Sequence, residues 1–311
     1  MTQLAHPVRL WSQHLANVAR AAFWLLLAII ILIQLGGSRG VDNRRAAVLG
    51  QFEQERNSRV IALILRQESA SLLGLPVMGS ISIDDSEAVL RAIRLTPPEQ
   101  PIDIILHTPG GTVLAAEQIA KALVERKGKV TVFVPHYAMS GGTLIALAAD
   151  EIVMDPNAVL GPVDPQVGDL PAASIVQAVQ IKGPQRVSDD TLILADVAQK
   201  ARLQVVGFVA QLLLKHMPEK QALRVATVLS EGRWTHDFPI TVQAARSLGL
   251  KVSTEMPRTV YDLMDLYPQT GGVKPSVWYV PLRRTAAPAG PPAQPSPVAQ
   301  HPEDDRTRAT R

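Results

Sequence analysis

Apolar residues between positions 58 and 154 follow two different periods along the chain. Short β-branched and aliphatic runs, typical of buried strands, alternate with longer segments whose apolar residues recur every three or four positions, typical of amphipathic helices. The pattern predicts strands at Arg59–Leu65, Ile102–Leu106, Lys129–Val134 and Glu151–Met154, and helices at Asp85–Arg94, Val113–Arg126 and Gly141–Ala149. Asp84 or Asp85 is expected to cap the first of these helices. This alternation indicates an α/β fold built from parallel βαβ units.

After Gly161 the pattern becomes mostly helical. Helices are predicted at Ala172–Gln180, Asp189–His216, Glu219–Ser230 and Thr241–Leu248, and we expect them to cover the sheet or to form an oligomer arm. From residue 286 onward, proline, alanine and charged residues dominate, and such a composition cannot bury enough apolar surface to fold. The sequence therefore predicts one folded domain over residues 58–285 and a disordered tail over 286–311.

A different apolar segment lies near the N-terminus, at residues 21–37. It reads AAFWLLLAIIILIQLGG, is just long enough to cross a bilayer as a helix, and carries Trp24 where an interfacial anchor would lie. A cleaved signal peptide and a buried helix are the alternatives, but a flank of residues 1–20 is long for a signal peptide and no A-x-A site follows. We therefore expect a single-pass protein of a bacterial inner membrane, with a helical connector at residues 38–57.

Composition and charge exclude several classes of function. The chain has 47% apolar residues and a formal charge of +3, but much of its positive charge lies in the two flanks, at 39–45 and 283–311. No basic stripe with interleaved aromatic residues occurs, so no nucleic-acid partner is expected. The chain has no cysteine, which excludes disulfides, thiolate metal sites and a cysteine nucleophile.

No cofactor or metal is expected either. The sequence has no G-x-G-x-x-G nucleotide fingerprint. Asp155 and Asp164 frame a loop rich in proline and glycine, but no further histidine or glutamate ligand stands close to them in the sequence. We interpret these two aspartates as turn and helix-cap residues.

Two glycine-rich turns follow predicted strands, where an α/β sheet presents its ligand-binding edge. The first is His107-Thr108-Pro109-Gly110-Gly111. Proline fixes φ, and the paired glycines let backbone N–H groups approach a ligand ahead of a helix N-terminus that favours negative charge. These properties suit an oxyanion hole, although an ordinary tight turn would have the same composition.

The second turn contains Ser140, in the sequence Tyr137-Ala138-Met139-Ser140-Gly141-Gly142-Thr143. Ser140 would lie at the start of a helix among small residues, and Gly141 would offer its N–H to a developing oxyanion. A serine before an apolar run is often only a helix N-cap. Two such turns about 30 positions apart, each ending a strand of one sheet, favour the interpretation of Ser140 as a nucleophile.

These motifs resemble a known family. HTPGG and AMSGG, followed by IALAADEIVMDPNAVLGPVDPQ, are similar to the ClpP-fold serine peptidases, and in particular to the serine dehydrogenase proteinases, relatives of signal peptide peptidase A. The similarity covers Arg59–Pro257. It implies a ClpP/crotonase-like spiral of ββα units, a homo-oligomer, a peptide or protein substrate, Ser140 as nucleophile, and Gly111 and Gly141 as oxyanion donors.

Several residues compete for the role of general base. Clp-type enzymes use a histidine soon after the serine, and 161–171 contains none. Relatives of signal peptide peptidase A use a lysine, and Lys182 stands where such a lysine is expected, with apolar neighbours that would lower its pKa. Lys200 is the second candidate, although pairing with Asp196 along a helix explains it more simply.

Three histidines, His107, His136 and His236, are further candidates for the site. His107 and His136 lie next to the two turns, and we expect them, with Gly110, to line the cleft in structural or substrate-contact roles. His236 and Asp237 could complete a triad with Ser140, but adjacent side chains of an extended segment point to opposite faces.

The sequence thus predicts a membrane-anchored serine peptidase in which Lys182 takes the proton of Ser140. Two alternatives remain: a crotonase-like acyl-CoA enzyme, which uses the same oxyanion hole without a serine nucleophile, and a non-catalytic oligomeric scaffold.

Overall fold

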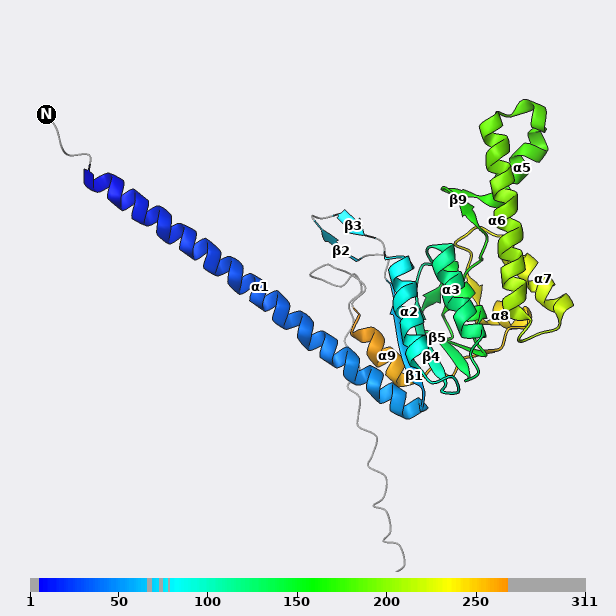
Figure 1. Ribbon diagram of the computed structural model, residues 1–311, viewed down its shortest axis with the longest axis horizontal. Helices are drawn as coiled ribbons and strands as arrows, with labels where there is room; N and C mark the ends of the chain where they lie inside the picture. The colour runs from blue at the N-terminus through cyan, green and yellow to red at the C-terminus, as the bar shows by residue number, and fades with distance from the viewer. Residues whose placement is uncertain (1–5, 66–68, 73–74, 78, 268–311) are drawn as a thin grey trace, which may run out of the picture. The chain divides into compact units, whose positions relative to one another are not determined.

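The computed structural model describes the backbone of residues 6–65, 69–72, 75–77 and 79–267 (Figure 1). Side chains are described for residues 17–27, 40–65 and 79–267. The predicted tail at 286–311 and the predicted domain end at 285 lie outside these residues.

A five-stranded parallel sheet forms the centre of the described chain, in the order β1-β4-β5-β7-β12. Its strands are β1 (Arg59–Ile64), β4 (Ile102–His107), β5 (Val130–Val134), β7 (Glu151–Met154) and β12 (Val252–Ser253). The first four are the strands that the hydrophobic pattern predicts. They are connected in turn by the helices α2 (Ile83–Leu95), α3 (Val113–Val124) and α4 (Gly141–Leu147), as βαβ units require.

The two faces of this sheet are buried by different parts of the chain, because successive strand residues point to opposite sides. Ile104 and Val132 belong to the larger core beneath α2, α3 and α4, and Figure 1 shows α2 and α3 lying over the strands. Ile105 and Phe133 face the other way, toward Phe52 of α1 and the helix α9 (Arg258–Asp265). A sheet buried on both faces is a rigid support for the turns at its carboxyl edge.

The start of α2 differs from the prediction that Asp84 or Asp85 caps it. Ser82 is the N-cap: its side chain accepts from the Asp85 N–H at 3.2 Å. The Asp85 carboxylate in turn accepts from the Ser82 N–H at 2.9 Å. Asp85 is therefore the third residue of a capping box, and the serine satisfies the helix N–H group.

A second, three-stranded sheet of very short strands lies next to the central one. It has the order β11-β8-β6, with β6 at Tyr137–Ala138, β8 at Val159–Leu160 and β11 at Ile240–Thr241. Strands of two residues have no measurable period, which is why the sequence does not predict them. β5, β6 and α4 form one ββα unit, and an isolated bridge joins Thr108 to Ala138.

The remaining helices match the predicted helical half of the chain. They are α5 (Ala172–Lys182), α6 (Asp189–Leu213), α7 (Glu219–Ser230) and α8 (Val242–Ser247), with a short 3-10 turn at Pro184–Arg186. α5 packs along α6 through a small apolar cluster around Ala172, Ile175 and Ala198 (Figure 1). Two antiparallel pairs complete the described elements: β2 (Ser69–Leu72) with β3 (Leu75–Val77), and β9 (Gln166–Val167) with β10 (Leu170–Pro171).

The N-terminal helix α1 (His6–Arg56) is 51 residues long and contains both the predicted anchor and the predicted connector. Its C-terminal part packs on the domain: Phe52 is buried, and Arg45 donates hydrogen bonds to the carbonyl oxygen of Leu266. Within the part of the chain that the structure describes, no helix has the length and apolar character needed to cross a bilayer. The side chains of residues 28–37, which form much of the predicted anchor, lie outside the described part.

Candidate active site

The two glycine-rich turns lie directly against each other at the carboxyl edge of the central sheet. The Thr108 N–H donates to the Tyr137 carbonyl oxygen at 3.2 Å, and the Met139 N–H donates to the Thr108 carbonyl oxygen at 3.0 Å. This short parallel pairing continues β4 and β6 beyond the sheet proper and fixes the first turn relative to Ser140. The turns that the sequence singles out thus form one structural unit.

Ser140 has an unusual backbone conformation. Its φ is 51° and its ψ is −116°, a region in which a residue with a Cβ is strained. Its side chain makes no capping hydrogen bond to α4, so the role of ordinary N-cap does not explain the serine. Strain of this kind, which costs about 1–3 kcal/mol, is found at functional sites, where the rest of the fold holds the residue in place.

Gly110 brings the backbone of the first turn into contact with Ser140. Its φ is 107°, and a Cβ at this position would lie 2.7 Å from the Cβ of Ser140. A Cβ on Gly142 would lie 2.5 Å from Cγ2 of Thr108. Real Cβ contacts of this length do not occur, so glycine is required at both positions for the turns to approach this closely.

The amide groups of Gly111 and Gly141 are available for a ligand. Within the described residues neither N–H donates a hydrogen bond, although the backbone on either side of Gly111 is firmly held. The Ile81 N–H donates to the Gly110 carbonyl oxygen at 2.7 Å, and the Thr112 N–H donates to the Ile81 carbonyl oxygen at 2.9 Å. Two fixed donors next to a serine are the arrangement that stabilises an oxyanion.

A cavity of about 400 Å³ opens beside Ser140. Its walls come from both turns, from the loop after β8, from α6 and from the loop before β11. The residues that line it include Gly111, Ser140, Gly141, Leu144, Asp164, Val205 and His236. The serine, the two free amides and a titratable pair thus share one space.

That pair is His236 and Asp164. Nδ1 of His236 lies 2.8 Å from Oδ1 of Asp164, and the amide of Gln166 donates to the other carboxylate oxygen at 2.7 Å. Only 3% of the Asp164 side chain is exposed, whereas His236 is partly open to the cavity. The hydrogen bond that the His236 ring donates to Asp164 raises the pKa of His236 above its usual value, and partial burial of the ring opposes this effect. No hydrogen bond joins His236 to Ser140 within the described chain.

The partner of His236 is thus Asp164 rather than its neighbour Asp237. β8 and β11 are antiparallel, with Leu160 opposite Ile240. This pairing brings the loop after Leu160 next to the loop before Ile240, and Asp164 and His236 lie in these two loops. The interpretation of Asp164 as a turn residue missed this contact, because the two residues are 72 positions apart and are joined by strands too short to predict.

The comparison with known families agrees with this geometry. Residues 10–290 match the family described as ClpP-like SDH-type serine proteinase. The chain belongs to this family. Members are serine proteinases, so peptidase activity on protein substrates is implied, together with a mixed α/β ClpP-like fold that is often oligomeric.

Two archaeal relatives resemble this proteinase along most of their length. The uncharacterized protein MJ1495 of Methanocaldococcus jannaschii is 55% identical, covering 77% of this chain and 82% of the relative. The uncharacterized protein MJ0137 of the same organism is 52% identical, covering 85% of this chain and 92% of the relative.

Among solved structures, a mutant of the 1510-N membrane-bound stomatin-specific protease has a TM-score of 0.40 at 20% identity, over 59% of this chain and 79% of that one. ClpP1 from Listeria monocytogenes has a TM-score of 0.41 at 16% identity, over 66% and 97%.

Lys182 and Lys200, the two lysines considered as bases, lie elsewhere in this proteinase. Lys182 is the last residue of α5, is exposed, and does not line the cavity around Ser140. Its role as base therefore stays a prediction. Lys200 is exposed on α6 and pairs with Asp196 at 2.5 Å, which is the surface helix pair that the spacing indicates.

His107 and His136 are near the turns but do not line the cavity. The ring of His107, at the start of the first turn, is fully buried, and its centroid lies 4.3 Å from that of the Tyr137 ring. The ring of His136 stacks on it at 5.7 Å. These ring contacts connect the start of the first turn with the residues that lead into the second.

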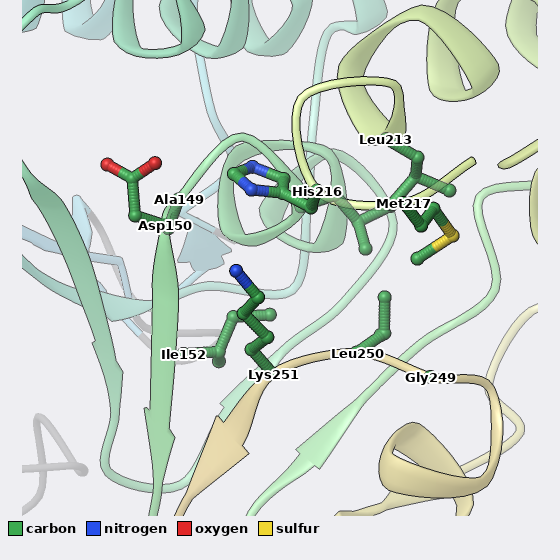
Figure 2. Close-up of a pocket in the computed structure, with 10 residues that line it drawn as sticks. Ala149, Asp150, Ile152, Leu213, His216, Met217, Gly249, Leu250 and Lys251 are labelled. Carbon is green, nitrogen blue, oxygen red and sulfur yellow. The ribbon is translucent and has the colours of Figure 1, made fainter. Parts of the chain in front are cut away.

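A second cavity, shown in Figure 2, lies away from the site. His216, Lys251 and Asp150 surround it together with apolar residues such as Leu213 and Met217. Its volume is about 20 Å³, room for about one water molecule. It is too small for a substrate, and burial lowers the pKa of His216 there.

The strain at Ser140 predicts an unusual order of stability among variants. Glycine adopts the conformation of Ser140 without a steric cost, so Ser140→Gly should be more stable than Ser140→Ala by about 1 kcal/mol. Ser174, an exposed residue inside α5, is the matched control, where alanine should be more stable than glycine by about the same amount. Chemical denaturation of the four variants measures both differences, and the same order at both positions would show that Ser140 is not strained.

Proposed function

We propose that this protein is a serine endopeptidase in which Ser140 attacks the substrate's peptide carbonyl. The amide N–H groups of Gly111 and Gly141 would hold the oxygen of the tetrahedral intermediate. The observation that carries this proposal is the position of Ser140 beside two free amides in one cavity. Its backbone is strained and its side chain makes no capping hydrogen bond. Membership of a serine proteinase family supports it.

For the general base, the cavity favours His236. In this mechanism Nε2 of His236 takes the proton from Oγ of Ser140, while Asp164 accepts from Nδ1–H and stabilises the imidazolium that forms. The imidazolium then gives its proton to the leaving amine, and the acyl group stays on Ser140. A water molecule, deprotonated by the same imidazole, hydrolyses the acyl-enzyme and regenerates the serine.

The Ser140–Lys182 dyad is the rival assignment. It has the support of the position of Lys182 in the sequence, but it requires this lysine to approach the cavity. A second copy of the chain in a homo-oligomer, or another arrangement of α5, would have to bring it there. His236, by contrast, already lines the cavity that contains Ser140.

A first prediction concerns the nucleophile. A fluorophosphonate should label the wild-type protein on Ser140, and Ser140→Ala should abolish both labelling and peptide hydrolysis. The control Ser174→Ala, on the exposed side of α5, should keep both. Labelling that persists in Ser140→Ala would remove this serine from the mechanism. A wild-type protein that is neither labelled nor active would instead favour the acyl-CoA or scaffold alternatives.

A second prediction concerns the base and its pH dependence. The base must be unprotonated, and Asp164 raises the pKa of His236 above its usual 6.5. The value of kcat/KM should therefore rise with pH, with a midpoint above 6.5. His236→Ala should reduce the rate by roughly two to four orders of magnitude. Asp164→Asn should both slow the reaction and move the midpoint to lower pH.

Lys182→Met is the discriminating control for this assignment. It keeps the apolar stem and removes the amine, so turnover should stay near that of the wild type if His236 is the base. A large loss in Lys182→Met together with a silent His236→Ala would restore the Ser–Lys dyad.

We also propose that the N-terminal apolar segment at 21–37 anchors the peptidase in a membrane. Support comes from its length and composition, and from Phe23, Trp24, Leu25 and Leu26, whose side chains are exposed on α1. The full chain should resist carbonate extraction from membranes, and a chain beginning at Asn43 should be released. A purified mature protein that begins near Val41 would show that the segment is a cleaved signal peptide.

A further inference from the structure

A larger hollow adjoins the cavity beside Ser140. This second hollow has a volume of about 690 Å³ and lies between the first turns of α3 and the middle of α6. Four residues, Val113, Pro165, Gln166 and Val205, line both spaces. The two hollows therefore adjoin each other along these residues, and we call the second one the α3–α6 groove.

The α3–α6 groove is mostly apolar and neutral. Leu114 and Leu203 are 57% and 63% exposed in its walls, and Phe208 lies beside them. Several glutamines supply the polar part of the lining. Among the residues that line it in the described chain, Glu117 is the only charged one.

Glu117 has an uncommon environment for a carboxylate. It is half-buried in the second turn of α3, and within the described residues no hydrogen bond or salt bridge joins its side chain to another group. Burial raises its pKa, because the charged form loses water and gains no partner. A partly buried carboxylate without a partner is a cost to the fold that a ligand cation would offset.

The position of Glu117 relates it to the reacting serine. Val113 lines the cavity around Ser140, and Glu117 follows one helical turn later on the same face of α3, with Leu114 beside it. Four residues of helix advance by about 6 Å, which an extended peptide covers in about two residues. From this spacing we expect a substrate side chain within a few residues of the scissile bond to reach this carboxylate.

We propose that Glu117 forms a subsite for a lysine or arginine side chain of the substrate, an inference that rests on the proposed function of Ser140. The aliphatic stem of the basic residue would lie along Leu114 and the other apolar walls, with its charged end at the carboxylate. The groove thus selects peptides with one basic residue near the cleaved bond.

The test uses fluorogenic peptides in which one position at a time is lysine or norleucine, which has a similar stem and no amine. At one position within about three residues of the scissile bond, the wild-type kcat/KM should favour lysine about three- to tenfold, the range of a partly exposed ion pair. Glu117→Gln should bring this ratio to about one. Glu117→Lys should instead favour a glutamate peptide over the lysine peptide.

The matched control is Glu125→Gln, at the exposed C-terminal end of α3 and outside the groove. It should keep the wild-type lysine preference. The proposal is overturned if the wild type shows no such preference at any position, or if the preference survives both changes at Glu117.

Fluorophosphonate labelling of Ser140 in the same preparations separates this inference from the proposed function. If the wild type is labelled but shows no lysine preference, the subsite alone is wrong. If no labelling or hydrolysis occurs, binding of the same peptides to Ser140→Ala, measured by fluorescence anisotropy, still tests the subsite. Tighter binding of the lysine peptide that is lost on adding Glu117→Gln supports it, and equal binding overturns it.

Discussion

The backbone conformation of Ser140 is the constraint on which the site depends. A residue with φ of 51° and ψ of −116° keeps this conformation only when its neighbours allow no other. Thr108 holds the chain before the serine through two backbone hydrogen bonds, and the Gly142 N–H holds the chain after it by donating to the Met139 carbonyl oxygen at 2.7 Å. Thr143 adds a third support, since its hydroxyl lies 2.8 Å from the Ala138 carbonyl oxygen. The central sheet is buried on both faces, and its stability offsets the free-energy cost of this strained turn.

The proposed base and its aspartate are brought to the serine's cavity by a separate feature of the fold, the pairing of β8 with β11. These strands are short, yet their antiparallel register brings the loop that carries Asp164 to the loop that carries His236. Thr143 links the serine turn to the β8–β11 pair, because its hydroxyl accepts a hydrogen bond from the Gly161 N–H at 3.0 Å, just after β8. Nucleophile and proposed base thus come from distant parts of the chain and share one rigid frame. The groove beyond them, with Glu117 in its wall, would add selectivity without disturbing that frame.

The sequence predicts the central part of this arrangement well, because long periodic segments determine it. Four strands and the helices between them are confirmed, and the two glycine-rich turns lie where strand ends meet. The contact of His236 with Asp164 could not be predicted, since strands of two residues have no period and aspartate in a loop rich in proline is usually a turn residue. The pairing of β8 with β11 was the missing information. Sequence position favours Lys182 as base, but it carries no information on whether α5 reaches the cavity.

The most direct test of the account is a crystal structure of the protein with a peptide boronic acid. We predict a covalent bond from boron to Oγ of Ser140, with one boronate oxygen about 2.7–3.1 Å from the amide nitrogens of Gly111 and Gly141. Nε2 of His236 should lie within hydrogen-bonding distance of the boronate or of the serine oxygen. A boronate bound elsewhere, or bound to Ser140 with its oxygens turned away from both amides, would contradict the account.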